Sequence, residues 1–339
     1  MGSDKRQATL ADIAEMAGVS TATVSRVLNR SPLVAPEMRE RIEAVIAQHE
    51  YYPHAAARAL ASNRTYTIGA VIPTLNNAIF AATINALERT LHEADYTLLV
   101  AVSNYDLHSE EVQVRRLLER GVEGFFLVGN DHTGALYRAL KHARKAYVNT
   151  WVYDPEVRRP NIGFSNRTAT RTLVDHLLAL GHRRIGMIAG IVDGNDRARD
   201  RVLAVEERLS EEGLALEFMT EVPYAIEASR SALADLIENE RLPTALICGN
   251  DVIALGALFE AVEKGVPVPG RLSITGFDNL PLTAHIRPAM TTVDVPAEEI
   301  GVAAGKALLH AIASGGRVRS RELVAPLLVR KTTSPPPKL

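Results

Sequence analysis

Residues 9–29, TLADIAEMAGVSTATVSRVLN, decide how the amino-terminal part of this chain folds, because they predict two short helices joined by a tight turn. Thr9 suits the N-cap of the first helix. Apolar residues follow it at the spacing of one buried helical face: Leu10, Ile13, Ala14 and Ala17. Gly18 gives the turn its conformational freedom, and Ser20 is placed to cap a second helix that ends near Leu28.

The outer face of the second helix is suited to DNA. Its residues are short and polar or carry a methyl group near the start, and are cationic or carry an amide farther along: Thr21, Ala22, Ser25, Arg26 and Asn29. Such a helix can place its first turn in the major groove while its later residues reach phosphates and base edges. The pattern alone also fits an ordinary helical hairpin with a solvated face.

The composition predicts a globular protein of two or three domains, since the chain has 339 residues and 47% of them are hydrophobic. Cys248 is the single cysteine, which excludes an intramolecular disulfide and fits a reducing compartment. No apolar run precedes Thr9, and no later segment has the length needed to span a bilayer. We therefore expect a cytoplasmic protein.

The distribution of charge is more informative than the net charge of −2. Residues 18–36 and residues 51–65 each contain arginines and no acidic residue, whereas Glu37, Glu40 and Glu43 lie together between them. Two basic surfaces on either side of an acidic helix are expected if only the basic surfaces meet phosphate.

A third helix is predicted over residues 37–49, with Pro36 in its first turn, and it completes a headpiece of residues 1–50. Residues 55–61, AAARALA, have high helix propensity but are too few to form a stable helix alone. We expect residues 51–65 to be a linker whose helix folds only when something holds it.

From residue 66 onward, apolar strands alternate with amphipathic helices. Strands are predicted over residues 67–72, 96–102, 124–128, 146–151 and 161–164, and again over 184–189, 217–222, 245–249 and 272–277. Helices are predicted near residues 80–94, 109–120, 134–143, 168–180, 197–212, 227–238 and 252–264. This rhythm favours parallel sheets with helices on both faces, and its two rounds favour two similar lobes. Residues 292–295 are expected to return the chain to the first lobe for a helix over 297–312, before 323–329 finish the second lobe.

Residues 9–29 resemble the DNA-binding headpiece of the LacI/GalR family of bacterial repressors. The family signature T-L-x-D-I-A-x-x-A-G-V-S-x-A-T-V-S-R-V-L-N is filled at almost every position. The resemblance implies a set of DNA-contacting residues: Thr9, Ser20, Thr21, Ala22, Thr23, Ser25, Arg26, Asn29, Tyr51, His54, Ala57 and Leu60. Of these, Thr21 and Ala22 are expected to set operator preference, and Arg26 can pair with guanine through two hydrogen bonds.

The resemblance also implies that the segment over residues 55–61 is a hinge helix, ordered on the operator. There Leu60 is expected to enter a base step and kink the DNA, at a cost of roughly a few kcal/mol that wider contact offsets. Leu60 could instead pack against the headpiece. His54 departs from the asparagine that is usual at the start of this helix.

Residues 66–333 resemble the periplasmic-binding-protein-like core of the same family. The supporting motifs are LGHRRI at 180–185, CGNDVIALGA at 248–257, SITGFD at 273–278, and Pro288 with TTV at 291–293. The implied fold is an all-α helix-turn-helix headpiece followed by an α/β core of two doubly wound parallel-sheet lobes. The first lobe takes residues 66–164 and 294–321, the second takes 165–293 and 322–333, and residues 334–339 are a disordered tail. That tail lacks a leucine-heptad extension, so a homodimer is expected.

Ligands of open α/β lobes bind beyond the carboxyl ends of the strands, where this chain has polar and aromatic residues. The expected effector-binding residues are Asn76, Trp151, Phe164, Arg201, Tyr224, Asn250 and Asp278, of which the resemblance supplies Arg201, Asn250 and Asp278. Structural roles are possible for several: Asp251 could cap a helix, Asp278 could satisfy a turn, and Trp151 could be core. The family commonly has R-x-x-G and then an aromatic residue, whereas VLAV follows Arg201, so Arg197 or Arg199 could serve instead.

The sequence shows no enzyme chemistry. It has no G-x-G-x-x-G after a strand, no Walker motif, no metal-ligand spacing among its histidines and no nucleophile elbow, so we expect no cofactor and no metal.

The favoured hypothesis is a repressor of a carbohydrate or sugar-acid operon that binds a pseudo-palindromic DNA operator and responds to a small effector. Arginines in the cleft favour an acid sugar, and RGVEG at 120–124 with NDRA at 195–198 is similar to gluconate-utilisation repressors of the family. A solute-binding protein of a transport system is opposed by the missing signal peptide and by the headpiece. A repressor gated by a protein co-regulator stays open.

Overall fold

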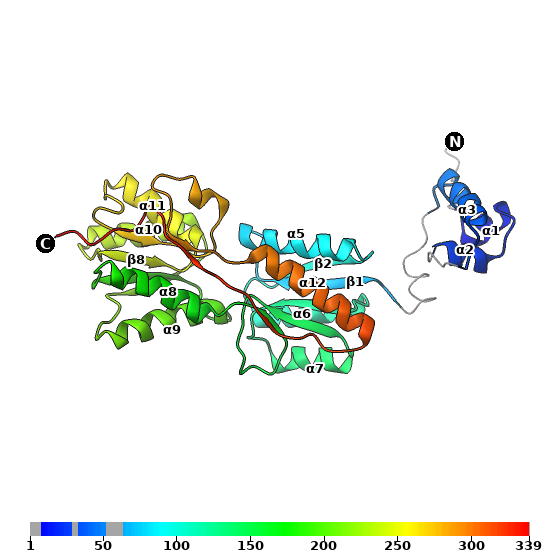
Figure 1. Ribbon diagram of the computed structural model, residues 1–339, viewed down its shortest axis with the longest axis horizontal. Helices are drawn as coiled ribbons and strands as arrows, with labels where there is room; N and C mark the ends of the chain where they lie inside the picture. Colours follow the sequence, from blue (N-terminus) through cyan, green and yellow to red (C-terminus); the bar gives the residue numbers. More distant parts are fainter. Residues whose placement is uncertain (1–7, 29–32, 52–63, 339) are drawn as a thin grey trace. The chain divides into compact units, whose positions relative to one another are not determined.

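The computed structural model describes residues 8–28, 33–51 and 64–338. The chain divides into two compact units, Met1–Thr65 and Tyr66–Leu339 (Figure 1). The predicted DNA contacts at Asn29, His54, Ala57 and Leu60 lie outside the described residues.

The amino-terminal unit contains three described helices: α1 (Leu10–Met16), α2 (Thr21–Leu28) and α3 (Pro36–Gln48). Thr9 begins α1 as predicted, because its hydroxyl accepts a hydrogen bond from the Asp12 amide while the Asp12 carboxylate accepts one from the Thr9 amide at 2.7 Å. Ser20 caps α2 by accepting from the Thr23 amide at 3.2 Å. These caps satisfy amides that a helix start leaves without partners.

One small core holds the three helices together. It consists of buried residues from every helix, and all but Ile42 of α3 come from residues 13–27: Ile13, Ala14, Ala17, Val24, Val27 and Ile42. Of the inner face predicted for α1, Ile13, Ala14 and Ala17 are buried as expected, and Leu10 is a half-buried neighbour of this core. On α3, Val45 and Ile46 contribute only as half-buried neighbours of this core.

The first lobe is built on a six-stranded sheet in the order β11-β5-β4-β3-β1-β2, and every pairing in it is parallel. Its strands are β1 (Thr67–Ile72), β2 (Thr97–Val102), β3 (Gly124–Val128), β4 (Ala146–Thr150), β5 (Asn161–Gly163) and β11 (Arg321–Glu322). The helices are α5 (Ala78–His92), α6 (Leu107–Glu119), α7 (Gly134–His142) and α12 (Ala297–Ser314).

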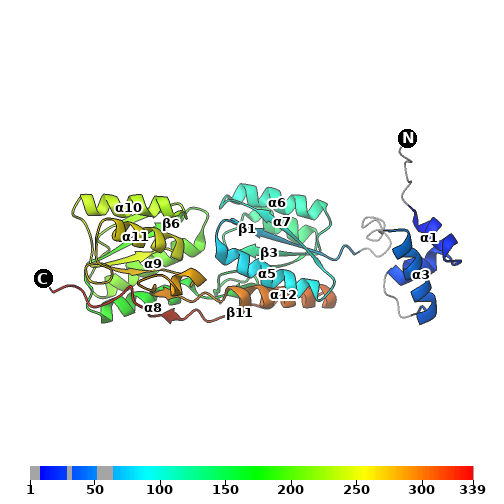
Figure 2. The same ribbon diagram turned by 90° about the horizontal axis from the view of Figure 1, so that it is seen from above.

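Successive side chains of a strand point to opposite faces, and this alternation distributes the helices over the sheet. Phe126 and Val128 of β3 pack in one core with α5 and α12, while Phe125 and Leu127 pack in another with α6 and α7. Figure 2 shows the two helix pairs on opposite sides of the sheet.

The second lobe repeats this architecture around a parallel four-stranded sheet in the order β7-β6-β8-β9. Its strands are β6 (Ile185–Gly190), β7 (Met219–Val222), β8 (Ala245–Cys248) and β9 (Ser273–Thr275). Its helices are α8 (Asn166–Ala179), α9 (Asp196–Glu211), α10 (Ile226–Glu238) and α11 (Asp251–Glu263), and a short 3-10 helix, η1, spans Pro281–Ala284. Residues of α8 and α9 pack on one face of the sheet, and residues of α10 and α11 pack on the other.

The chain passes between the lobes after β5, before α12 and after β11 (Figure 1). The prediction that residues 322–333 belong to the second lobe is wrong at its start. Glu322 pairs with Gly163 in the first-lobe sheet, and the Leu323 amide donates to the Gly163 carbonyl at 2.7 Å. The last segment then pairs as β12 (Leu327–Leu328) with β10 (Thr292–Val293), so the two late crossings form an antiparallel ribbon.

The predicted disordered tail is also wrong at its first residue. The Ser334 carbonyl accepts from His182 Nε2 at 2.9 Å, and the Ser334 amide donates to the Ser273 hydroxyl at 3.2 Å. These bonds tie the end of the chain to the second lobe, a contact between distant segments that tail composition does not reveal. Among the described residues, no helix combines the length and the apolar character needed to cross a membrane.

Candidate functional site

A cavity lies between the lobes where the carboxyl ends of their strands meet. The first lobe contributes Tyr105, which follows β2, and Trp151, which follows β4. The second lobe contributes Tyr224, Asn250 and Asp278, which follow β7, β8 and β9. The remaining lining residues come from the starts of α5 and α9: Asn77, Ile79, Phe80, Asn195, Arg197, Ala198 and Arg201. This is the place where open α/β sheets bind their ligands.

The enclosed space is small, about 30 Å³, which is enough for about two water molecules. Pockets for organic ligands usually measure roughly 300–1,000 Å³. A sugar-sized ligand can therefore enter only if the lobes move apart. A second cavity of about 520 Å³ lies at the same lobe boundary, lined among others by Tyr153, Phe164 and Asp200.

Three of the residues that line this cavity have a strained backbone. Tyr105, Trp151 and Asp278 have φ angles of 62°, 68° and 122°, in the region that residues other than glycine seldom adopt. Each such residue costs on the order of 1–3 kcal/mol and persists only where the surrounding structure holds it. All three side chains line the cavity. The strained backbone conformations are therefore those that direct these side chains into it.

Asp278 and Arg201 carry the site's electrostatics. Burial raises the pKa of Asp278 to about 8, and nearby Arg201 only partly opposes this shift. Burial also lowers the pKa of Arg201. The Arg201 guanidinium donates to Asn166 Oδ1 at 2.9 Å and to the Gly249 carbonyl at 2.7 Å, and it lies 3.6 Å from the centre of the Phe277 ring.

The second arginine of the cavity is neutralised, unlike Arg201. Arg197 donates to Asp196 Oδ1 at 2.8 Å, and the other oxygen of Asp196 accepts from the Asn130 amide of the first lobe at 2.5 Å. Arg201 forms no ion pair with a described carboxylate within 4.0 Å. The site thus holds one compensated guanidinium and one that has only neutral hydrogen-bond partners.

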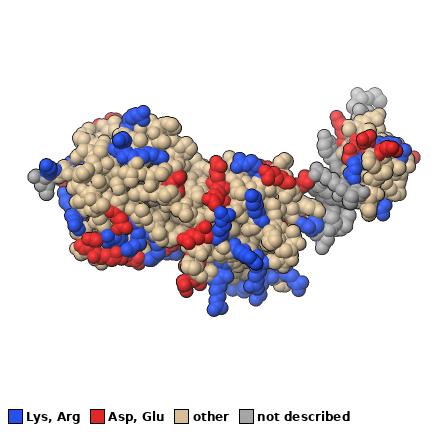
Figure 3. Space-filling model, viewed as in Figure 1, with Lys and Arg blue, Asp and Glu red and all other residues tan. Residues whose placement is uncertain are grey.

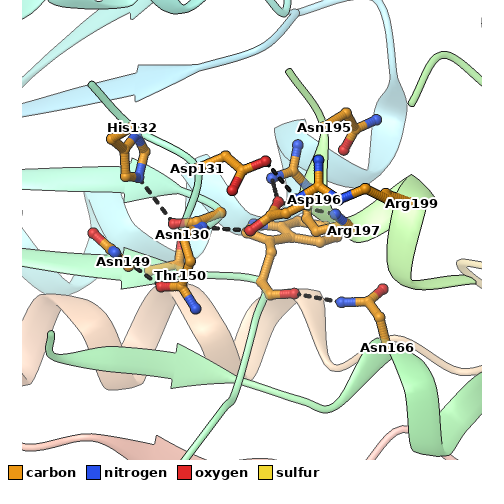
Figure 4. A network of polar contacts seen from close by, with 12 residues as sticks. Asn130, Asp131, His132, Asn149, Thr150, Asn166, Asn195, Asp196, Arg197 and Arg199 are labelled. Carbon is orange, nitrogen blue, oxygen red and sulfur yellow. Dashed lines mark hydrogen bonds and ion pairs between the residues drawn. The ribbon is translucent and has the colours of Figure 1, made fainter. Parts of the chain in front are cut away.

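Figure 4 shows how the lobes meet beside the cavity. Residues after β3 in the first lobe receive the start of α9: Arg199 pairs with Asp131 at 2.6 Å, next to the Asp196–Asn130 contact. His132 holds this loop in place, since its ring nitrogens lie 2.7 Å from Glu110 and 2.9 Å from the Gly129 carbonyl.

Three buried polar atoms of the cavity have no hydrogen-bond partner among the described residues. Two are donors, the indole Nε1 of Trp151 and Nδ2 of Asn250, and one is an acceptor, Oδ1 of Asn195. A buried polar group without a partner costs about 1–3 kcal/mol, so these atoms are suited to a ligand that carries both acceptors and donors, such as a hydroxylated compound.

The structure brings five of the seven predicted effector residues together: Trp151, Arg201, Tyr224, Asn250 and Asp278. Asn76 does not line this cavity: it is exposed, and its neighbour Asn77, which caps α5, lines the cavity instead. Phe164 lines the second cavity, where its ring stacks at 6.1 Å on Phe277.

Asp251 does not cap α11 as the sequence allowed, because Asn250 is the N-cap, but Asp251 has another structural role. The carboxylate of Asp251 is fully buried and accepts from the Leu280 amide at 2.7 Å and from Thr292 Oγ1 at 2.6 Å. Asn250 accepts from the Ile253 amide at 3.0 Å.

Sequence reasoning missed Tyr105, whose ring stacks on Tyr224 across the lobe boundary at 5.5 Å. The signal was present, since Tyr105 follows a strand as the other lining residues do. Arg197 was considered only as a substitute for Arg201, whereas both arginines line the cavity.

On the headpiece, α2 presents an exposed face while Val24 and Val27 are buried behind it. Thr21, Ala22 and Arg26 are exposed, and Thr23, Ser25 and Tyr51 are half-buried. The exposed Thr9 and Ser20 use their hydroxyls as helix caps. The described part of the predicted DNA-contacting set therefore centres on one helix face.

A helix-turn-helix unit joined to a two-lobed α/β core with a cavity between the lobes defines the class of ligand-responsive bacterial regulators. Residues 9–54 match the model of bacterial regulatory proteins of the lacI family, and residues 174–333 match that of the periplasmic binding protein-like domain. The chain belongs to the LacI family of DNA-binding transcriptional regulators.

Similar proteins agree with this assignment over nearly the whole chain. The chain is 30% identical to the HTH-type transcriptional repressor PurR of Erwinia tasmaniensis, over 96% of each protein. It is 31% identical to the ribose operon repressor of Haemophilus influenzae, over 90% of this chain and 92% of that protein. A solved structure of the lac repressor dimer bound to operator and the anti-inducer ONPF has a TM-score of 0.86 and 26% identity, and the match covers 97% of this chain and all of that one.

Proposed function

We propose that this protein represses a carbohydrate or sugar-acid utilisation operon. In a homodimer, α2 of each protomer reads half of a pseudo-palindromic operator. A small effector bound between the core lobes alters this binding. The observation that carries the DNA-binding part is the exposed face of α2, with Thr21, Ala22 and Arg26 on one side and the headpiece core on the other. Such a helix fits the major groove.

Selection of duplexes from a randomised DNA pool tests this part directly. We expect the purified protein to enrich a pseudo-palindrome whose half-sites have related sequences, as two-fold symmetry requires. Enrichment of no sequence, or equal affinity for the selected duplex and a scrambled one, would contradict sequence-specific binding.

The effector is proposed to be a hydroxylated acid. Arg201 has only neutral partners, and Asp278, with a pKa of about 8, is largely protonated near neutral pH and offers it little compensation. A ligand carboxylate would supply the missing charge through a charge-assisted hydrogen bond, and hydroxyls could pair with Trp151 and Asn195.

A thermal-shift panel of neutral sugars and their acid counterparts tests the effector. A ligand at a hundred times its Kd should stabilise the protein by about 2.7 kcal/mol. We expect acids to stabilise more than the matched neutral sugars, and Arg201→Gln to remove this difference. Equal shifts from both members of each pair would favour a neutral effector.

Homodimer formation is supported by exposed apolar residues on the core. Phe259 and Val262 of α11 are 41% and 64% exposed, and Val100 on the edge strand β2 is 41% exposed. Edge strands and apolar helix faces of this kind are usually covered by a partner. Sedimentation velocity should give a dimer for the unmodified protein and a shift toward monomer for Val262→Glu.

The alternatives make different predictions. A solute-binding protein of a transport system would not enrich an operator, and the helix-turn-helix unit disfavours it. A repressor gated by a protein co-regulator would bind its operator without responding to any metabolite in the panel. We place the protein in the cytoplasm, at the nucleoid when it is bound to DNA.

We assign the protein no enzymatic activity. The support for this is that its family consists of DNA-binding transcriptional regulators.

A further inference from the structure

The edge of the first-lobe sheet at which the strands begin is also where the core joins the headpiece. All six strands are parallel, so the segments that lead into them approach from the same side of the sheet, although β5 and β11 begin farther along it, since Asn161 pairs with Asn149 and Arg321 with Ile162. The chain that leaves the headpiece enters this edge at Tyr66, directly before β1.

Cationic residues precede four consecutive strands along this edge. In the spatial order β11, β5, β4 and β3, the segments that lead into the strands contribute seven residues, here called the basic edge: Arg317, Arg319, Arg158, Arg159, Arg144, Lys145 and Arg120. All are exposed except Lys145, which is half-buried. Figure 3 shows Lys and Arg gathered on this lobe over α7 and near the end of α12.

The basic edge is uncompensated by ion pairs. None of its seven residues forms an ion pair within 4.0 Å with a carboxylate in the described parts of the chain. In the second lobe, by contrast, arginines are largely paired, for example Arg171 with Glu211 at 2.7 Å and Arg184 with Glu217 at 2.6 Å. The positive charge of the first lobe is thus left available to an external partner.

Acidic residues near the same edge offset only part of this charge, and two of them, Asp154 and Glu156, lie in the segment that leads into β5. Glu93 and Asp95 lie before β2, at the opposite side of the sheet from β11. Glu123 accepts from the Tyr66 amide and the Tyr96 hydroxyl, and Glu119 lies next to Arg120. The segments that lead from α7 into β4 and from α12 into β11 contain no acidic residue.

Helix dipoles explain only part of the pattern. Arg120 directly follows α6, and Arg144 lies two residues beyond the end of α7, where a cation stabilises the carboxyl end of a helix. Arg159 stacks on the Tyr137 ring at 3.8 Å. Arg158 and Arg319 follow loop segments and have no such role, so the presence of these two calls for another cause.

We infer that the basic edge binds the phosphate backbone of DNA that flanks the operator, as a second, sequence-independent contact. This inference rests on the proposed DNA-binding function. Exposed arginines and lysines without carboxylate partners are the groups that neutralise phosphates. The length of the segment that joins the headpiece to the core supports the same partner. The dozen residues between Tyr51 and Arg64 can span at most about 45 Å. DNA that the headpiece binds therefore stays within that reach of this edge.

The test compares two duplexes that carry the same selected operator: one of about 20 base pairs, and one extended by about 15 base pairs on each side. The variant Arg144→Gln/Lys145→Gln/Arg317→Gln/Arg319→Gln removes four charges from the basic edge. A control with the same change of net charge, Arg183→Gln/Arg241→Gln/Lys264→Gln/Lys331→Gln, alters exposed positions of the second lobe.

We expect unmodified protein to bind the long duplex at least tenfold more tightly than the short one, with a slope of log K against log salt that is steeper by one or more. The basic-edge variant should lose this advantage and keep its affinity for the short duplex, while the control variant keeps both. Equal binding of both duplexes by unmodified protein overturns the inference. So does a loss that the control variant shares, which would reflect net charge alone.

This experiment distinguishes a failure of the proposed DNA-binding function from a failure of the role inferred for the basic edge. If no variant binds even the short duplex, the proposed function fails. If every variant binds it and the flanks have no effect, DNA binding stands and only the role of the basic edge is refuted.

Discussion

Asp278 combines backbone strain, burial and an unusual protonation state in one residue. Its φ of 122° and its exposed fraction of 4% place the carboxyl against the lobe boundary. The sequence predicted the position, because a polar residue follows a strand there. It could not predict the strain or the protonation, since both depend on what Arg201 and the opposite lobe place around the carboxyl.

The pH dependence of the free energy of unfolding should report the ionisation of the Asp278 carboxyl. Burial raises the pKa of Asp278 from 3.8 to about 8 and that of Asp251 to about 7. Between pH 4 and these values each of the two carboxyls is protonated in the folded protein and ionised in the unfolded chain, so its contribution to the free energy of unfolding falls as pH rises. Each group contributes a slope of up to about 1.4 kcal/mol per pH unit. Urea unfolding at several pH values should show this fall, and Asp278→Asn should reduce the slope.

The exposed Asp235→Asn on α10 serves as the matched control, since it removes a carboxylate far from the cavity. Identical slopes for Asp278→Asn and the control would mean that Asp278 is ionised in the folded protein.

Arg26 is the residue for which base reading can be tested most simply. It is exposed on α2, and a bidentate contact with guanine is worth about 1–3 kcal/mol. Arg26→Ala should weaken binding to the selected operator by that amount and relax the preference at one base position. Fluorescence anisotropy on operator and scrambled duplexes measures both effects, with the exposed Arg41→Ala on α3 as control. An equal loss on both duplexes would assign Arg26 to phosphate contact.

At the scale of elements, the pairing of α12 with α5 depends on two glycines. A Cβ at Gly301 would collide with the backbone carbonyl of Thr83 and approach the Leu87 amide at 2.9 Å. A Cβ at Gly305 would meet only side-chain atoms, of which Thr90 Cγ2 is the nearest at 2.9 Å. Backbone cannot yield as a side chain can, so the two positions differ in tolerance.

Gly301→Ala should therefore destabilise the protein by about 1–3 kcal/mol through overpacking. Gly305→Ala should be nearly neutral, because the gain in helix propensity of about 1 kcal/mol offsets a smaller clash. Chemical denaturation of the two variants provides the comparison. Equal costs would show that α12 shifts as a whole to relieve the contact.

Most elements were predictable because their signals are local. Strand β1 and the starts of β3 and β4 agree with the apolar runs, and Thr9 and Ser20 begin their helices as their side chains require. The short β11 and β12 were not, because their partners β5 and β10 lie far away in sequence. Two-residue strands carry no periodicity from which to infer a partner.

At the scale of the whole molecule, polar contacts hold the lobes together around a cavity too small for a sugar. The Asp131–Arg199 pair is partly exposed, whereas in the Asp196–Asn130 contact Asp196 is buried and Asn130 is half-buried. Their removal should favour the open arrangement. An exposed pair contributes roughly 0.2–1 kcal/mol, and a buried charged group left without its partner costs more.

We accordingly expect Arg199→Gln to increase the effector association rate modestly, and Asp196→Asn to increase it further. Single-molecule fluorescence between dyes on α7 and α10 should show a larger open population in the same order. Arg171→Gln is the matched control, because its partner Glu211 lies in the same lobe. A control effect equal to that of Arg199→Gln would argue against a role for the contact between lobes.

The triple crossing of the chain constrains how such a protein can be recombined. The amino-terminal unit is one continuous segment that ends at Thr65, so a single genetic junction there can transplant operator recognition onto another core. Neither lobe is continuous in sequence. In the first lobe, α12 and β11 follow the whole of β6–β9, and Ser334, after β11, bonds to the second lobe again. Effector recognition can therefore be inherited only as an entire core, and new pairings of operator with effector should arise by exchange of headpieces.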